Sequence, residues 1–293
     1  MKITKQDKDL ILTDIKDFSL QQTLECGQCF HFKNFGEGEF AVVYKKNLLH
    51  AKEKNDKIIL YNLSLKDFEN IWKHYFDLER DYGSIKKAII KSDKRLSQAV
   101  NDNYGVHILN AEFSETLMSF IISQNKQIPH IKKIVADISK EYGTFLGKIN
   151  EEEFYSFPDV SQMKDISEDD YSRLKTGFRA KYLRDAAQKM ANDTDMSYEV
   201  LNKMGYEKAK DKLTTIKGVG DKVANCVLLY SLGYRNAFPV DVWIKRIMEH
   251  LYFENDTKNE VIYEFAKEKF GEYGGYAQQY LFYYARSNGI GKK

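Results

Sequence analysis

The spacing of apolar positions changes along the chain, and the change divides it near residue 105. Up to about residue 62, short runs of aromatic and β-branched residues alternate with polar turns. Such runs are typical of strands joined by tight connections, so the pattern predicts an antiparallel meander. The predicted strands cover residues 28–32, 39–44, 48–51 and 57–61.

Helical periodicity follows the strands. Phe68, Ile71, Trp72 and Tyr75 lie three or four residues apart or side by side, so they share one helical face. From about residue 105 the pattern is helical throughout, and Pro129 suits the first turn of a helix. The predicted helices cover 65–76, 84–90, 94–100, 112–123, 129–141, 151–157, 169–174, 179–191, 198–201, 206–213, 259–270 and 276–285, with two more beginning at 221 and 241.

These elements predict an α+β fold of two domains. Residues 1–104 form an N-terminal domain with a twisted antiparallel β-sheet and helices, and residues 105–293 form an all-α domain. A chain of 293 residues is long enough to give each domain a core of its own. The chain shows no internal repeat, no low-complexity segment and no long flexible linker.

One stretch, residues 213–251, carries most of the candidate chemistry. It contains a tight turn, Gly218-Val219-Gly220, at the start of an apolar helix, and later Pro239-Val240-Asp241 before another helix. Glycines allow a sharp turn and a close approach of the backbone, and a helix start with free N–H groups favours an anion such as phosphate. Lys222 and Asp241 each lie near the start of one of these helices.

Composition indicates where the protein is located and what it binds. No apolar run approaches the ~20 residues of a membrane span, and the charged N-terminus lacks the apolar core of a signal peptide. We therefore expect a cytoplasmic, intracellular protein with no membrane partner. The net charge is only +2, but residues 173–189 hold six basic residues and one acidic residue. Such a strip suits a phosphate backbone, although a solvated helix face is the simpler explanation when the strip is taken alone.

The cysteines argue against a metal site and an iron–sulfur cluster. Cys26 and Cys29 form a CxxC, which suggests redox chemistry or zinc, but no second CxxC or close His pair completes a metal site. The third cysteine, Cys226, is followed by no other cysteine. We therefore expect no iron–sulfur cluster and no required cofactor.

The turn, the lysine and the later Val-Asp pair together resemble the helix-hairpin-helix glycosylase superfamily of base-excision DNA repair. This resemblance implies that Lys222 attacks C1′ of a deoxyribose and forms a Schiff base, and that strand cleavage by β-elimination follows. The alternative for Lys222 is a surface lysine that binds phosphate. Asp241 would stabilise positive charge near C1′, and it also suits an N-cap whose N–H bonds favour the ionised carboxylate. Gly218 and Gly220 would lie against DNA.

Further segments narrow the resemblance. Cys26-Gly27-Gln28-Cys29-Phe30, Ser123-Gln124-Asn125, residues 177–182 and residues 274–282 look like the 8-oxoguanine DNA glycosylase family of eukaryotic type, in the same order. The resemblance implies that the Gly27 carbonyl accepts the N7–H that only the oxidised base carries. Cys226 and Phe282 would sandwich the flipped base, and Gln278 would read its Watson–Crick edge. Taken singly, these residues are an ordinary turn glycine, core side chains and a solvated glutamine.

The resemblance also implies a set of contacts with damaged double-stranded DNA. Asn125 would fill the space left by the extruded nucleotide, Phe178 would wedge the base stack, and Arg179 would hold the opposite base or backbone. His130 replaces an Arg that helps to recognise the opposite cytosine, and Trp243 replaces a phosphate-binding His. Because His is shorter and often neutral, we expect a weaker dependence on cytosine opposite the lesion.

Other departures lie nearby. Lys126 and Gln127 replace two asparagines, Phe178 replaces a Tyr, and Tyr230 replaces a Met. In the family, backbone carbonyls at positions matching Thr214, Ile216 and Val219 hold a monovalent cation, Na⁺ or K⁺. We expect a monomer.

Three alternatives stay open from the sequence. The first is a glycosylase of the same superfamily with another target, such as an alkylated base or an oxidised pyrimidine. The second is a hairpin module that binds DNA without catalysis. The third is a redox role for Cys26 and Cys29.

Overall fold

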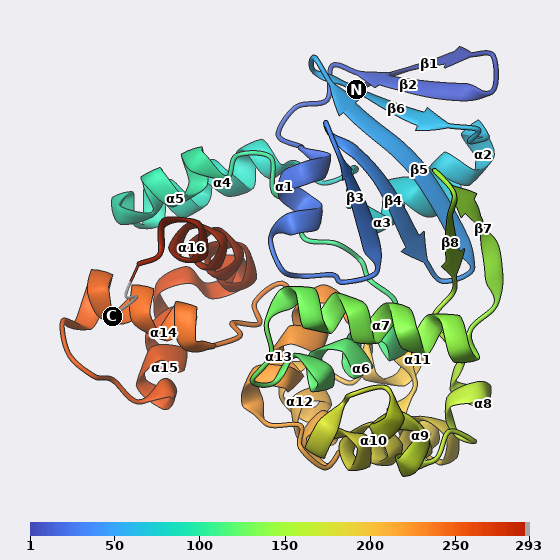
Figure 1. The fold of residues 1–293 in the computed structure, drawn as a ribbon. Helices are drawn as coiled ribbons and strands as arrows, with labels where there is room; N and C mark the ends of the chain where they lie inside the picture. Colours follow the sequence, from blue (N-terminus) through green and yellow to red (C-terminus); the bar gives the residue numbers. More distant parts are fainter. Residues whose placement is uncertain (291–293) are drawn as a thin grey trace.

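The computed structural model describes residues 1–290, and Figure 1 shows a sheet and its helices above a helical layer. The sheet has six antiparallel strands in the order β1-β2-β6-β5-β4-β3. Its strands span β1 (Lys2–Gln6), β2 (Asp9–Thr13), β3 (Phe32–Gly36), β4 (Glu39–Tyr44), β5 (Asn47–Lys54) and β6 (Lys57–Tyr61). The N-terminal hairpin β1–β2 was not predicted. Leu10 and Leu12 alternate toward the core, but the charged residues around them obscure this pattern in the sequence.

The strand predicted at residues 28–32 is wrong, since β3 begins only at Phe32. Gln28 is buried, and its amide donates to the carbonyls of Thr23 (2.9 Å) and His107 (2.7 Å). Its Oε1 accepts the Leu109 N–H at 2.9 Å. These bonds hold residues 26–31 as an ordered loop between α1 (Leu20–Glu25) and the sheet. The apolar run that suggested a strand reflects burial against the second layer.

Two hydrophobic clusters organise the molecule. One lies on the sheet and contains Phe40, Phe68 and Trp72, so the helix predicted over 65–76 covers the sheet, with a π-helical centre at Phe68–Trp72. The other fills the helical layer and extends to α4 (Tyr82–Ser92) and α5 (Ser97–Asp102). In both figures α5 lies beside the last helix, α16 (Gly274–Asn288). Because packing does not follow chain order, the division into 1–104 and 105–293 stays a prediction.

The helical layer agrees with the predicted periodicity at most positions. Pro129 lies in the first turn of its helix, as predicted. No described helix is long and apolar enough to cross a membrane. The layer contains α6 (Phe113–Ser123), α7 (Ile128–Tyr142), α8 (Val160–Met163), α9 (Glu168–Arg173), α10 (Ala180–Asn192), α11 (Tyr198–Leu201), α12 (Tyr206–Thr214), α13 (Asp221–Tyr230), α14 (Val242–Met248), α15 (Asn259–Phe270) and α16.

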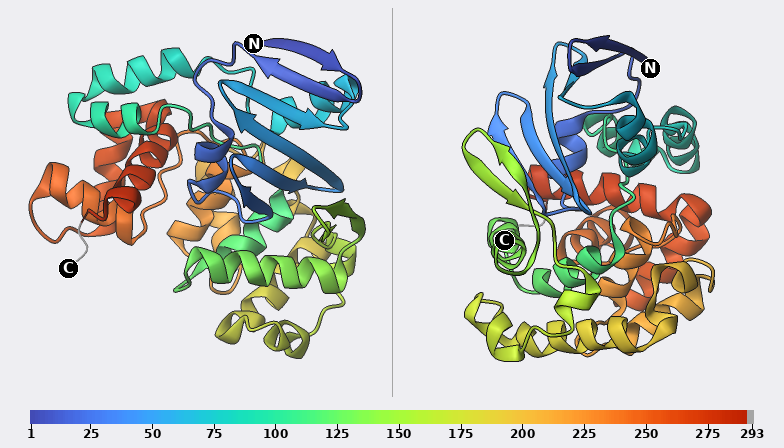
Figure 2. Two further views of the ribbon diagram at one scale, coloured as in Figure 1. Left: turned by 45° about the horizontal axis from the view of Figure 1, so that its top comes forward. Right: turned by 90° about the vertical axis from the view of Figure 1, so that its right-hand side faces the viewer.

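The helix predicted at 151–157 is wrong. Most of these residues belong to a hairpin of β7 (Phe145–Ile149) and β8 (Glu152–Tyr155), which lies beside the large sheet (Figure 2). Asn150 and Glu151 both have positive φ, as the tight turn requires. Asn150 also donates to Glu39 at 2.9 Å, and Lys33 pairs with Glu152 at 2.8 Å. These tertiary contacts stabilise strands where the sequence alone favours a helix.

Candidate active site

The predicted hairpin joins α12 to α13. At Gly218, φ is +77° and a Cβ atom would lie 2.3 Å from Cδ2 of Tyr182 in α10. Only glycine therefore fits where the hairpin packs against α10. Gly220 is the N-cap residue of α13, and the space beside it is open. The two glycines therefore have different roles: Gly218 permits close packing, and Gly220 leaves the helix start accessible.

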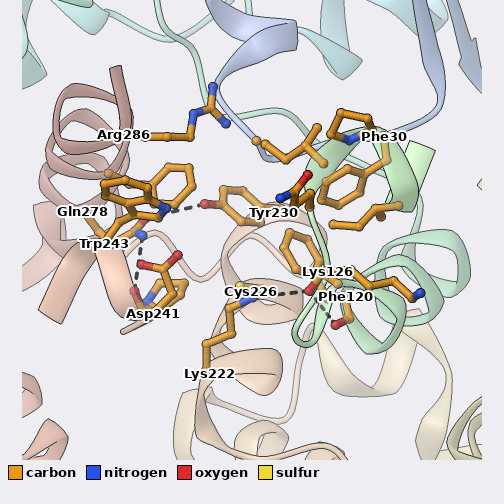
Figure 3. Close-up of a pocket in the computed structure, with 18 residues that line it drawn as sticks. Phe30, Phe120, Lys126, Lys222, Cys226, Tyr230, Asp241, Trp243, Gln278 and Arg286 are labelled. Atoms are coloured by element: carbon orange, nitrogen blue, oxygen red, sulfur yellow. Dashed lines mark hydrogen bonds between the residues drawn. The ribbon is translucent and has the colours of Figure 1, made fainter. Parts of the chain in front are cut away.

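Lys222 lies in the first turn of α13 and lines a pocket of about 430 Å³ (Figure 3). Its Nζ lies 3.4 Å from the Ser123 hydroxyl and 5.1 Å from the centroid of the Phe120 ring. Both partners belong to α6. The amine therefore points into the pocket, held by one weak hydrogen bond and an aromatic face.

Asp241 lines the same pocket from the start of α14. Its Oδ1 accepts the Ile244 N–H at 2.8 Å, which confirms the predicted N-cap. Burial raises the pKa of this carboxyl above its usual value, while the Ile244 N–H and the charge of Lys222 act in the opposite direction. The expectation of a readily ionised carboxylate rested on the hydrogen bonds alone, and burial outweighs them.

The four residues expected to hold a base meet in this pocket. Gly27 comes from the loop after α1, Cys226 from α13, and Gln278 and Phe282 from α16. Burial raises the pKa of the Cys226 thiol to about 11, so the thiol stays neutral. Gln278 donates from Nε2 to the Pro239 carbonyl at 3.2 Å, which fixes its amide plane.

Sequence reasoning missed several pocket residues, among them Phe30, Phe120 and Arg286. Tyr230, noted only as a departure, stacks on Phe120 with centroids 5.5 Å apart. Helical spacing could have found Arg286, which follows Phe282 by four residues, and it also places Tyr230 on the face of Cys226, four residues earlier.

Gln279 is fully buried beside the pocket and was also missed. It accepts from the Tyr230 hydroxyl at 2.5 Å and donates to the Cys26 carbonyl at 3.1 Å. It therefore ties the loop that contains Gly27 to the last helix.

Several residues expected at a DNA surface lie outside this pocket, whereas Trp243, Lys126 and Gln127 line it. Asn125 and His130 are exposed, and Asn125 has a positive φ of 49°.

Phe178 and Arg179 also lie outside it. Phe178 is 52% exposed, and the guanidinium of Arg179 lies 4.2 Å from its ring centroid. Arg179 is buried and donates to the carbonyls of Thr176 and Gln124, so it supports Phe178 and the loop after α6.

The CxxC does not form a disulfide: Cys26 and Cys29 are free. Burial raises the pKa of Cys26 to about 12 and that of Cys29 further, so both thiols stay neutral and unreactive. Within residues 1–290, no group of three or more His, Cys, Asp or Glu side chains could hold a metal ion. These thiols suit a structural role.

Two family models and several known proteins match this chain. Residues 10–117 match the family model described as 8-oxoguanine DNA glycosylase, N-terminal domain. Residues 118–271 match that of the HhH-GPD superfamily base excision DNA repair proteins. A probable N-glycosylase/DNA lyase of Methanothermobacter thermautotrophicus is 31% identical over 76% of this chain and 75% of its own length. N-glycosylase/DNA lyase OGG1 of Arabidopsis thaliana is 27% identical over 91% of this chain and 77% of its own length.

A solved structure is similar over almost the whole chain. The 8-oxoguanine glycosylase/lyase of Clostridium acetobutylicum, in complex with double-stranded DNA containing cytosine opposite to 8-oxoG, is 36% identical. Its TM-score is 0.94, and the match covers 99% of each chain. The similarity therefore includes both the sheet and the helical layer.

Proposed function

The chain belongs to the 8-oxoguanine DNA glycosylase family within the HhH-GPD superfamily, and we propose from this premise which of its residues remove the base and cut the strand. It is a bifunctional base-excision repair enzyme, an N-glycosylase and DNA lyase that acts on 8-oxoguanine in DNA.

Lys222 is the nucleophile. Its neutral amine forms a bond from Nζ to C1′, the bond from C1′ to N9 breaks, and the electron pair leaves with the base. The amine then loses a proton, the sugar ring opens to a Schiff base, and β-elimination releases the 3′ phosphate. Placement in the first turn of α13, facing the pocket, supports this role.

Asp241 stabilises the positive charge that develops on the sugar. The carboxylate is fixed by its bond to the Ile244 N–H, so it needs no reorganisation when charge develops at C1′. Its raised pKa also makes it a better proton acceptor than an exposed aspartate, which suits proton transfer from the amine. Capping and catalysis are compatible in one side chain.

The base is read from both ends of the chain. The Gly27 carbonyl accepts N7–H, and Cys226 and Phe282 contact the two faces of the base. The Tyr230 hydroxyl has a single proton, and it donates this proton in a hydrogen bond to Gln279 Oε1 at 2.5 Å. Gln278 Oε1 lies 3.5 Å from the same hydroxyl. Gln278 Oε1 is therefore free to accept a hydrogen bond from the Watson–Crick edge of the base.

Duplex DNA binds across the open side of the pocket. Asn125 fills the gap in the stack, Phe178 wedges the neighbouring base pair with support from Arg179, and His130 and Trp243 face the DNA backbone or the opposite strand. The exposure of Asn125, His130 and Phe178 supports this placement. The glycines of the hairpin bring N–H groups to a phosphate.

The hairpin also suits a monovalent cation. Carbonyl oxygens of Thr214, Ile216 and Val219 would hold it, and the cation would help to bind phosphate. Ile216 O accepts the Val219 N–H at 3.0 Å and keeps a second lone pair for an ion. Equal DNA affinity in potassium and tetramethylammonium salts of the same concentration would contradict this site. We further propose that the enzyme works as a monomer inside the cell, since one chain supplies the whole pocket.

The convergence of Lys222 and Asp241 with the four base-binding residues in one pocket carries this proposal. The test uses a duplex with one 8-oxoguanine and borohydride, which traps a Schiff base. We expect a covalent adduct with the wild type and with Lys217→Gln, an exposed lysine of the same hairpin, and none with Lys222→Gln. DNA binding without any adduct would support a binding module instead. Faster trapping on an alkylated base or an oxidised pyrimidine would support another target.

A further inference from the structure

Arg286 supplies a cation to the pocket that the mechanism above does not use. It lies one turn after Phe282 on α16, and its guanidinium lies over the rings of Phe282 (5.6 Å) and Tyr283 (5.2 Å). Nη2 donates to the Glu25 carbonyl. Figure 3 shows the guanidinium reaching from α16 across the top of the pocket. The side chain is therefore held firmly in one orientation.

The other terminal nitrogen of Arg286 has no hydrogen-bond partner. Nη1 is buried, and no described residue accepts from it. A Cβ atom placed on Gly27 would lie 3.0 Å from Nη1, so this donor lies directly beside Gly27. A buried charged donor without an acceptor is costly, so the site is complete only when a ligand supplies one.

The chemistry of the lesion supplies an acceptor at this place. In 8-oxoguanine the N7–H is adjacent to the carbonyl at C8, whereas guanine has an acceptor at N7 and a C–H at C8. We infer that Arg286 determines specificity by donating from Nη1 to the C8 oxygen while Gly27 accepts N7–H. The enzyme then reads both atoms that oxidation changes. This inference rests on the proposed binding of the base beside Gly27.

The same contact assists base release. When the bond from C1′ to N9 breaks, the electron pair stays on N9 and is conjugated with the C8 carbonyl, so its oxygen gains negative charge. A fixed guanidinium at that oxygen is more strongly bound to the departing base than to the intact nucleotide. Arg286 is thus expected to affect the rate of excision as well as binding.

A substitution at the lesion separates this role from a structural one. In 8-thioxoguanine, sulfur replaces the C8 oxygen; the N7–H remains, but sulfur is a weaker acceptor. Single-turnover excision is measured for both bases with the wild type, Arg286→Leu, Arg286→Lys and the control Tyr283→Phe. Cleavage of a preformed abasic site and borohydride trapping are measured in parallel, because they require Lys222 but no base.

We expect the wild type and Tyr283→Phe to prefer oxygen over sulfur by the same ratio. Arg286→Leu should reduce that ratio by about tenfold or more, since the lost bond involves a charged donor. Arg286→Lys lacks the rigid, planar guanidinium and should give an intermediate ratio. This variant provides the test if Arg286→Leu does not fold. An unchanged ratio in the Arg286 variants overturns the inference, while trapping at the abasic site shows separately whether Lys222 chemistry stands.

Discussion

A Cβ atom placed on Gly27 would lie 2.9 Å from Cε1 of Phe282. The two residues lie far apart in the sequence, since Gly27 follows α1 and Phe282 belongs to α16, and folding brings them into contact. Gly27 also has φ of +86°, a backbone conformation that residues with a side chain seldom adopt. A side chain at position 27 would therefore displace the Phe282 ring, and only glycine leaves that ring in place against the base.

Gly27→Ala should abolish base excision but spare the lyase. The methyl group displaces Phe282 and enters the base site, whereas an abasic sugar needs no base site. Single-turnover excision and abasic-site cleavage are compared with Gly36→Ala, which has φ of +90° but no atom within 4 Å of an added Cβ. Both variants should lose about 1–2 kcal/mol of stability from backbone strain, and only Gly27→Ala should lose excision. Equal activity in the two would contradict this reading.

Asp241→Asn should separate catalysis from capping. Because the pKa of Asp241 is raised above its usual 3.8, the folded chain binds this proton more tightly than the unfolded chain. Stability from this group therefore rises as pH falls through the folded-state pKa, and the charge costs stability at neutral pH. Asn keeps the cap without the charge, so thermal unfolding at pH 7 should show no loss, while excision falls by about 10²-fold or more.

Asp241→Ala is the matched comparison, because it removes charge and cap together. It should lose about 1 kcal/mol of stability. A loss of stability in Asp241→Asn as large as in Asp241→Ala would show that the charge itself holds the helix start.

His107 should make the protein sensitive to mild acid. Its ring is buried, stacks on Tyr82 at 3.6 Å, and burial lowers its pKa to about 4. The unfolded chain therefore binds this proton more tightly, so stability is lost as pH falls from about 6.5 toward 4. The loss amounts to about 3 kcal/mol. Denaturant unfolding across this range should show a shallower pH dependence for His107→Asn, and parallel curves would contradict the assignment.

Phe178→Ala should weaken DNA binding without affecting the fold. The ring is 52% exposed, so its removal should change the free energy of unfolding by less than about 0.5 kcal/mol. Loss of stacking on a base should weaken binding of the lesion duplex by about tenfold. Phe145→Ala is the control, because Phe145 lies in the β7–β8 hairpin and is equally exposed. If both variants bind DNA as well as the wild type, Phe178 is not the wedge.

His130→Arg should introduce a preference for cytosine opposite the lesion. His130 lies exposed in the first turn of α7, where a longer charged fork could reach the opposite base. Excision is measured with each of the four bases opposite 8-oxoguanine. The wild type should give rates within a few fold of one another, and Lys133→Arg on the same helix should not change them. A steep preference of the wild type for cytosine would contradict the prediction that His130 weakens recognition of the opposite base.

Periodicity of apolar residues was sufficient for most helices, because each helix buries one face. It failed where tertiary contacts decide. Residues 151–157 read as helical, yet Asn150 and Glu151 form a turn and the strands pair beside the large sheet. Residues 28–32 read as a strand, yet the hydrogen bonds of Gln28 hold a loop. No local pattern encodes those distant partners.

The same limit applies to the pocket. Lys222, Asp241 and the base-binding residues were found through motifs, and the structure brings them together. Gln279 was missed because its partner, the carbonyl of Cys26, is a backbone atom that carries no sequence signature. Such positions emerge only once the fold places the two ends of the chain side by side.

The bond between Gln279 and Cys26 joins residues 253 positions apart. During synthesis on the ribosome, the segment with Lys222 emerges before α16 exists. Until α16 emerges, the loop that contains Gly27 lacks this anchor, and the pocket lacks Gln278, Phe282 and Arg286. The base-binding pocket therefore forms only after both ends of the chain have been synthesised and have packed together.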